Sequence, residues 1–289
     1  MTYEEMPEEW QEWLALTPLE RFRQSEQIFA QYLTMGGSLD PDPDPTSPFY
    51  DPETSGTGAA YGGQACVFYG AAQFSKDVDL ALLASEENFS RLLAALSDLN
   101  AKRIAVPRFD PDLLARGHAV HFRCQGGDAD GLRVDVMTRL RDLADFAVLW
   151  ARRTTISDEN GETFELLSVG DLVQAKKTQR ERDWPMIDAL VEGHYRALGR
   201  EPTSERVAFW LAESRTPERL MGLVQRFPNE ARAHSSQRPL LRLAFSGESE
   251  ALRKALDAEA RAEQAKDRAY WAPLKAEFEA FRHAEREGC

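Results

Sequence analysis

Residues 61–82 read YGGQACVFYGAAQFSKDVDLAL: a glycine pair, a short helical stretch and an alternating strand. In the run DVDLAL the apolar residues alternate with Asp77 and Asp79, so an extended chain directs them to one side and both carboxylates to the other. Paired carboxylates bind Mg²⁺, and a glycine turn lets backbone N–H groups approach a triphosphate. This stretch therefore predicts a site for metal-assisted phosphoryl or nucleotidyl transfer.

A third acid, Asp135, lies in a second alternating run, residues 132–137. Its apolar neighbours Val134 and Val136 belong to the buried side, which predicts that Asp135 lies on the open side. Residues 119–124 precede this run across a polar, glycine-containing connection, which is a hairpin signal. If the hairpin lies beside the Asp77 strand, three carboxylates converge on one sheet face. Such a set is sufficient for two divalent ions that share ligands.

The order of these motifs, Gly-Gly, then Ser-x-Asp-x-Asp-Leu, then a lone Asp in a later strand, resembles the nucleotidyltransferase superfamily, whose fold is shared with DNA polymerase beta. Within it the pattern is similar to that of the bacterial minimal nucleotidyltransferases of the AbiE-type toxin branch. Lys176, Arg180 and Asp183 follow the third acid in the order found in that branch. The resemblance covers roughly residues 58–198, and it departs at Gln73, where the branch often has Arg.

The resemblance implies transfer of an NMP from an NTP, which is often ATP, to a hydroxyl of tRNA or of a protein. It also implies a role as a toxin or phage-defence component, with an antitoxin as a further expected partner. Two Mg²⁺ ions are the implied cofactors. The implied catalytic metal ligands are Asp77, Asp79 and Asp135, and the implied contacts to the NTP phosphates are Gly62, Gly63, Ser75, Lys176 and Arg180.

Each of these residues also has a purely structural interpretation. The two acids of a half-buried strand can simply face solvent, the glycine pair can form an ordinary tight turn, and Ser75 can cap the strand. On a single helix Lys176, Arg180 and Asp183 recur at i, i+4 and i+7, which also fits an exposed ladder of ion pairs. The five histidines show no ligand spacing, and no catalytic role is predicted for them.

Two other functions remain open at this level. A chain of net charge −13 attracts cations, which is compatible with nucleotidyl transfer to a small molecule such as an aminoglycoside. The loss of the usual Arg at Gln73 is compatible with a catalytically idle module that binds a partner through its C-terminal helices. The same charge argues against a general nucleic-acid binder, because non-specific binding requires phosphate neutralisation by Lys and Arg.

Composition predicts a globular cytoplasmic protein. The chain has 289 residues, of which 43% are hydrophobic, and this is enough for one large or two modest domains. No apolar run approaches the roughly 20 residues of a membrane span, so no membrane partner is expected. Cys66, Cys124 and Cys289 are scattered and odd in number, which suits a reducing compartment and gives no zinc spacing.

The predicted fold class is α+β, with a nucleotidyltransferase-type mixed sheet flanked by helices. Three segments are expected: an N-terminal helix with a Pro/Asp-rich arm over residues 1–57, a nucleotidyltransferase domain over 58–198, and a C-terminal helical domain over 199–289. Thr17, Pro18 and Glu20 predict the capped start of the first helix.

Two further expectations concern the ends of the chain. The acidic N-terminal segment is expected to complement a basic surface at Lys176 and Arg180 and thereby restrain the enzyme. The charged stretch 248–281 is expected to form a surface or partner-facing helix with a kink or break at Pro273.

Overall fold

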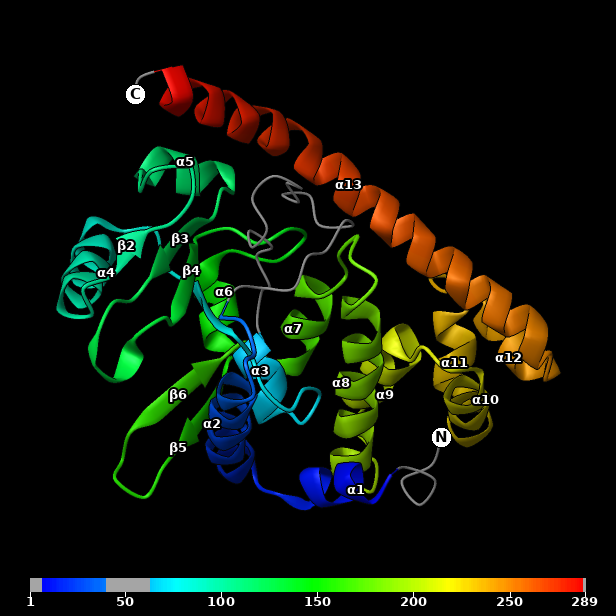
Figure 1. Ribbon diagram of the computed structural model, residues 1–289. Helices are drawn as coiled ribbons and strands as arrows, with labels where there is room; N and C mark the ends of the chain where they lie inside the picture. Colours follow the sequence, from blue (N-terminus) through cyan, green and yellow to red (C-terminus); the bar gives the residue numbers. More distant parts are fainter. Residues whose placement is uncertain (1–6, 40–62, 288–289) are drawn as a thin grey trace.

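The computed structural model describes residues 7–39 and 63–287 as an α+β structure built on a four-stranded mixed sheet (Figure 1). The expected α+β class is confirmed. The strand order is β1-β4-β3-β2. The four strands are β1 (Asp77–Ala81), β2 (Lys102–Arg103), β3 (Val120–Arg123) and β4 (Arg133–Met137). β3 and β4 form the predicted antiparallel hairpin, and β1 lies parallel to β4 at the edge of the sheet.

The register of the sheet aligns polar side chains across three strands. Asp79 of β1 is opposite Asp135 of β4, and Asp135 is opposite His121 of β3. Residues that face each other in this way project from the same side of a sheet. The acids of β1 and the acid of the hairpin therefore share one face, as the alternation predicts.

The opposite face of the sheet is apolar and is covered by α4 (Glu86–Asp98), with α5 (Pro111–Arg116) alongside. Ser85 caps α4 by accepting a hydrogen bond from the backbone N–H of Asn88. One core cluster joins this helix to the sheet: Phe89, Leu92, Leu96, Leu114, Val120, Phe122, Val134 and Val136. The burial of these residues fixes which sheet face carries the acids.

The N-terminal helices pack against residues 68–70, which precede β1 in the chain. α1 (Glu8–Ala15) precedes α2 (Pro18–Thr34), whose start shows the predicted capping box between Thr17 and Glu20. Arg21 is buried and donates two hydrogen bonds to the carbonyl of Phe68 in α3 (Gly63–Phe68). These bonds make α2 a structural neighbour of α3 and of the adjoining β1. The expected arm lies in residues 40–57, outside the described residues.

A second hairpin follows the sheet. α6 (Phe146–Ala151) leads into β5 (Thr154–Ser157) and β6 (Thr163–Leu166), which pair antiparallel. Phe164 of β6 contacts both Phe22 of α2 and Phe68 of α3, with ring centroids 5.2 Å apart in each pair. The hairpin therefore closes a space between α2, α3 and α6.

The remaining helices are α7 (Val169–Ala175), α8 (Asp183–Leu198), α9 (Ser204–Glu213), α10 (Pro217–Arg226), α11 (Pro228–His234) and α12 (Leu241–Ser246). They pack around α8 and α10, in which Ile187, Leu190, Leu220 and Leu223 are almost completely buried. The largest core cluster also contains Trp13 of α1 and Cys66 of α3. One apolar core thus unites residues from all three segments expected from the sequence.

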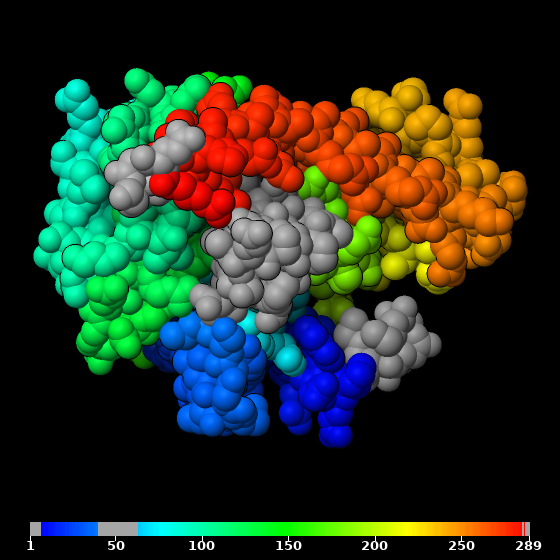
Figure 2. Space-filling view, turned by 45° about the horizontal axis from the view of Figure 1, so that its top comes forward, coloured from blue at the N-terminus to red at the C-terminus, as the bar shows by residue number. Residues whose placement is uncertain are grey.

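α13 (Ser249–Glu287) is a single helix of 39 residues, about 58 Å long at 1.5 Å per residue. Of the kink or break expected at Pro273, the break is wrong, because the helix continues through this residue. Packing holds the helix on both sides of the proline: Trp271 and Phe278 are buried against the end of the sheet, and Leu252 and Leu256 join the helical core. Figures 1 and 2 show α13 extending across the molecule from the C-terminal helices to the sheet.

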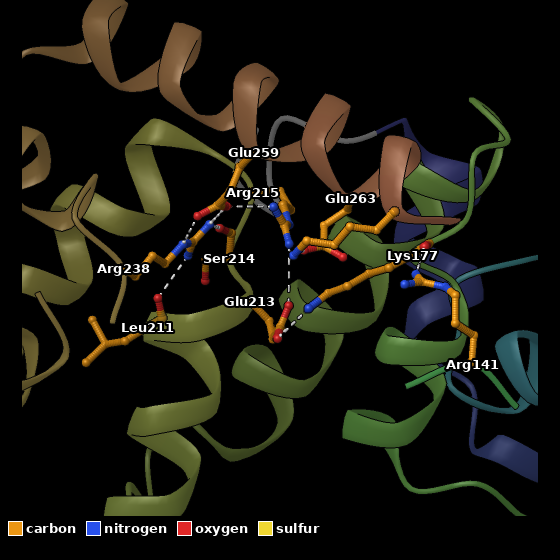
Figure 3. A network of polar contacts seen from close by, with 10 residues as sticks. Arg141, Lys177, Leu211, Glu213, Ser214, Arg215, Arg238, Glu259 and Glu263 are labelled. Carbon is orange, nitrogen blue, oxygen red and sulfur yellow. Dashed lines mark hydrogen bonds and ion pairs between the residues drawn. The ribbon is translucent and has the colours of Figure 1, made fainter. Parts of the chain in front are cut away.

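A polar network fastens α13 to the helices beneath it (Figure 3). Glu259 of α13 accepts hydrogen bonds from Arg215 at 2.8 Å and from Arg238 at 2.8 and 3.0 Å. Glu213, at the end of α9, accepts a hydrogen bond of 2.8 Å from Lys177. The network therefore reaches from the long helix to the residue that follows Lys176.

Candidate metal centre

The three predicted acids meet at one point of the sheet. One carboxylate oxygen each of Asp77, Asp79 and Asp135 lies within 4.8 Å of the other two. Asp77 and Asp79 are two residues apart in β1 and so share a face, and the parallel pairing with β4 adds Asp135 beside them. The convergence predicted from the alternating runs is what the strand register produces.

The expectation that these acids lie on an open face is wrong for two of the three. Asp77 is 2% exposed and Asp135 is fully buried, whereas Asp79 is half-buried. Strand alternation determines which face a side chain takes, but it cannot reveal that α3 packs against β1 on this second face. The centre is thus a sheltered cluster of carboxylates instead of an exposed one.

Asp135 is held by two basic side chains from the hairpin. Nε of Arg133 donates a 2.8 Å hydrogen bond to Oδ1 of Asp135, and Nδ1 of His121 lies 2.8 Å from the same oxygen. Burial acts to raise the pKa of Asp135, but the charges and hydrogen bonds of His121 and Arg133 bring it below its ordinary value. Asp135 is therefore ionised at neutral pH.

The second oxygen of this carboxylate has a different environment. Oδ2 of Asp135 is buried and has no hydrogen-bond partner among the described residues. A buried carboxylate oxygen without a partner is costly, and a bound ion or water offsets that cost. This oxygen is the strongest local indication that a cation belongs in the cluster.

His121 and Arg133 were not predicted as site residues. The sequence pattern nonetheless places both residues near Asp135. Arg133 is two residues before Asp135 in the same strand and therefore on the same face, and His121 belongs to the partner strand of the hairpin. Their contribution depends on the exact register, in which His121 pairs with Asp135 and Arg133 pairs with Asp77. The sequence does not specify that register.

Gly63 lies where no side chain fits. A Cβ added at Gly63 would meet Oγ of Ser75 at 2.0 Å and Oδ1 of Asp77 at 3.5 Å. Oγ of Ser75 in turn donates a 2.8 Å hydrogen bond to Oδ1 of Asp77. The start of α3 therefore approaches the first acid directly, and Ser75 orients that acid. The other predicted glycine, Gly62, is outside the described residues.

The surroundings of Asp77 disfavour its negative charge. Its burial, followed by repulsion from Asp135, raises the pKa of Asp77, while the hydrogen bond from Ser75 and the charges of Arg133 and Lys176 oppose this rise. Two buried carboxylates beside each other need positive charge. Arg133 and Lys176 supply part of it.

Lys176, Arg180 and Asp183 do not share a helix, and the predicted periodic arrangement is wrong. α7 ends at Ala175 with Lys176 as its C-cap, and α8 begins at Asp183. A turn joins the two helices, and it is held by backbone hydrogen bonds and by the indole N–H of Trp184, which donates to the carbonyl of Thr178 at 3.0 Å. The three residues meet through this turn instead of through a helical repeat.

The charged side chains of this turn are buried. Nζ of Lys176 lies 3.8 Å from Oδ1 of Asp183, and the guanidinium of Arg180 lies 2.8 Å from Oδ2 of the same residue. Lys176 and Arg180 are 1% and 2% exposed. The basic surface that an acidic N-terminal segment was expected to cover is therefore not formed by these residues.

The donor set fits a hard divalent cation. Three carboxylates are the oxygen ligands that Mg²⁺ prefers, and the described residues place neither a thiolate nor a histidine in the cluster of ligand atoms. Oxygens bound to one Mg²⁺ at about 2.1 Å lie at most about 4.2 Å apart. The observed spread of 4.8 Å requires only small side-chain rotations for one ion, and it also suits two ions with shared ligands.

A cavity of about 750 Å³ lies beside the centre. Ser75 and Asp79 contribute to its wall together with residues of α2, α3, α6 and β6. The four consecutive residues 78–81 also line it, so the cavity follows β1, whose only strand partner among the described residues is β4. A molecule in this cavity has direct access to Asp79.

Comparison with known proteins adds no assignment. No family model matches the chain, and no curated protein or solved structure is significantly similar to it. Within residues 7–39 and 63–287, no helix is both long and apolar enough to cross a membrane.

Proposed function

We propose that the protein is a Mg²⁺-dependent nucleotidyltransferase that moves an NMP from an NTP to an acceptor hydroxyl. One observation carries this proposal: Asp77, Asp79 and Asp135 converge from two parallel strands, and the buried Oδ2 of Asp135 has no hydrogen-bond partner in the described part of the chain. The mixed sheet and the motif order are those expected of the nucleotidyltransferase fold, which is part of the proposal.

In this function the three aspartates would hold the metal, either as one ion or as two. When bound, Mg²⁺ neutralises phosphate charge and lowers the pKa of the attacking hydroxyl. Ser75 orients Asp77 through its 2.8 Å hydrogen bond, and Arg133 and His121 orient Asp135. These contacts fix the ligand geometry before substrate arrives, which is the main contribution that a protein makes to phosphoryl transfer.

The transfer itself is a displacement at phosphorus. The acceptor oxygen forms a bond to the α-phosphorus, and the bond between that phosphorus and the bridging oxygen to the β-phosphate breaks. The electron pair leaves with pyrophosphate, and the hydroxyl proton passes to water. Gly63 allows the start of α3 to lie against Ser75 and Asp77, and Lys176 adds positive charge near Asp77. Arg180 supports Lys176 indirectly, because both share Asp183.

The test is calorimetric titration of Mg-ATP and of Mg-GTP into the wild type and into Asp79→Asn. We expect micromolar to millimolar binding by the wild type and at least a tenfold loss in the variant. Asp98→Asn, which changes an exposed acid at the end of α4, is the matched control. Equal affinity of wild type and Asp79→Asn for both nucleotides contradicts the proposal.

A readout without nucleotide comes from Mn²⁺, whose electron paramagnetic resonance signal falls on binding. The wild type is expected to bind Mn²⁺, and Asp135→Asn is expected to bind at least tenfold more weakly. The transfer to tRNA or protein, the toxin role and the antitoxin partner derive from the motif resemblance alone.

A further inference from the structure

The cavity beside the metal centre has an apolar body. Six aromatic side chains line it: Phe22, Phe29, Phe68, Phe146, Trp150 and Phe164. Three of them, from α2, α3 and β6, are in mutual contact, with ring centroids 4.8 to 5.2 Å apart. A volume of about 750 Å³ is within the range of sites that bind drug-sized molecules. Its walls therefore suit an apolar group and offer little to a solvated polyanion.

The polar part of the wall is acidic. Five carboxylates line the cavity: Glu26, Asp79, Asp128, Asp130 and Glu165. Arg153 is the only basic residue that lines it among the described residues, and it is paired with Glu165 at 2.7 Å. Glu26, Asp128 and Asp130 are exposed, so they form a negatively charged border around the apolar body. This charge complements a cation and repels the phosphates of RNA.

We infer that this cavity binds a small amphipathic amine: an apolar body, an ammonium group near Glu26 and Asp128, and a hydroxyl that reaches Asp79. The further statement that this molecule is the acceptor of the nucleotidyl group rests on the proposed function. As the acceptor it leaves as the nucleoside monophosphate ester of its hydroxyl, with pyrophosphate as the second product. The binding itself requires neither nucleotide nor metal.

Three probes of one length test the charge preference. They are 12-aminododecan-1-ol, which is cationic, 1,12-dodecanediol, which is neutral, and 12-hydroxydodecanoate, which is anionic. Calorimetry without nucleotide or Mg²⁺, below the concentration at which the probes aggregate, gives each affinity. We expect the amine to bind at least tenfold more tightly than the carboxylate, with the diol between them. Equal affinities, tighter binding of the carboxylate, or displacement of the amine by adenosine overturns the inference.

Two variants locate the site. Glu26→Gln/Asp128→Asn removes two of the three border charges and should weaken amine binding about fivefold while leaving diol binding unchanged. Glu201→Gln/Glu205→Gln removes the same charge from exposed positions at the start of α9 and should change neither. Ala30→Trp fills the cavity from the exposed side of α2 and should abolish binding of all three probes. Wild-type amine affinity in Ala30→Trp overturns the assignment to this cavity.

The acceptor role has a separate readout. Incubation of the wild type with α-³²P-labelled NTP, Mg²⁺ and 12-aminododecan-1-ol should yield a labelled ester, and Ala30→Trp should yield none. Binding of the amine without ester formation refutes the acceptor role but leaves the binding site intact. Absence of Mg-NTP binding in the calorimetric test refutes the proposed function and leaves the amine affinities as an independent result.

Discussion

Asp79 of β1 and Asp135 of β4 face each other as register partners on adjacent parallel strands. Like charges directly opposite in a sheet are destabilising. The pair persists in a buried cluster with Asp77, and only Asp135 is flanked by two basic side chains of its own hairpin. The arrangement is consistent with a fold whose stability depends on a bound cation.

The first prediction tests the proposed cation site. Mg²⁺ or Mn²⁺ should raise the melting temperature of the wild type, because a ligand that binds only the folded state stabilises it by about 2.7 kcal/mol at a concentration 100 times its Kd. Asp79→Asn/Asp135→Asn should melt at the same temperature with and without the ion. Differential scanning calorimetry measures both, with Asp98→Asn as the control that keeps the wild-type shift. A shift of equal size in the double variant counts against the centre.

The second prediction concerns Gly63. Gly63→Ala should destabilise the protein by about 1–3 kcal/mol, because a Cβ at this position meets Oγ of Ser75 at 2.0 Å. In a Ser75→Ala background the cost should fall, since the closest atom is then absent. Gly222→Ala is the control: it lies within α10 and its Cβ meets nothing within 4 Å. There the substitution should stabilise by up to about 1 kcal/mol.

Denaturant titrations of the four proteins and of the double variant Gly63→Ala/Ser75→Ala give these free energies. Equal costs of Gly63→Ala in the two backgrounds would show that Ser75 does not determine the need for glycine.

The third prediction is a pH dependence at Asp188. Burial, followed by repulsion from Glu192, raises the pKa of Asp188 to about 6, and its Oδ1 has no hydrogen-bond partner among the described residues. A carboxyl whose folded pKa exceeds its unfolded value of 3.8 favours folding when protonated. The stability that it contributes is therefore lost as the pH rises from about 4 to about 6, by at most about 3 kcal/mol.

Asp188→Asn removes this loss. The variant should be more stable than the wild type at pH 7.5 and about equally stable at pH 3.5. Urea denaturation at both pH values tests the difference. Asp257→Asn, an exposed acid on α13, should follow the wild type at both. A variant that is less stable than the wild type at pH 7.5 contradicts the assignment of the raised pKa.

The fourth prediction concerns Asp267 of α13. Asp267 is 1% exposed; it accepts a 2.8 Å hydrogen bond from the backbone N–H of Gln179 and pairs with Arg141 at 2.9 Å. Asp267 of α13 thereby stabilises the turn between Lys176 and Asp183. Asp267→Ala should cost about 3–5 kcal/mol, because it leaves the buried Arg141 without this partner.

Mg-ATP affinity should fall in the same variant, since the turn that positions Lys176 loses an anchor. Asp267→Asn keeps an acceptor for the N–H of Gln179 and should recover part of the affinity but less of the stability. Calorimetry and chemical denaturation separate the two effects. Asp257→Ala on the same helix should alter neither quantity.

Part of this structure is predictable from the sequence, and the reason is local. Alternation of apolar and acidic residues predicts β1 and β4, and turn residues predict the hairpin that joins β3 to β4. The capping box at Thr17 fixes the start of α2. The convergence of Asp77, Asp79 and Asp135 then needs only the parallel pairing of two predicted strands.

The remaining features depend on contacts between distant residues. Burial of Asp77 results from packing of α3, and the role of His121 requires the register of β3 against β4. The end of α7 at Ala175 is set by tertiary bonds of the following turn, including the one from Gln179 to Asp267, which lies 88 residues after Gln179 in the chain. Pro273 is tolerated because Trp271 and Phe278 are packed on either side of it. None of these contacts leaves a periodic signal in the sequence.

The long terminal helix has a mechanical consequence. α13 packs in the helical core near Leu252 and against the sheet near Phe278, so it connects the helical core to the sheet. Loss of the packing at one end of α13 weakens the packing at its other end. The sheet and the helical bundle should therefore unfold in a single cooperative step.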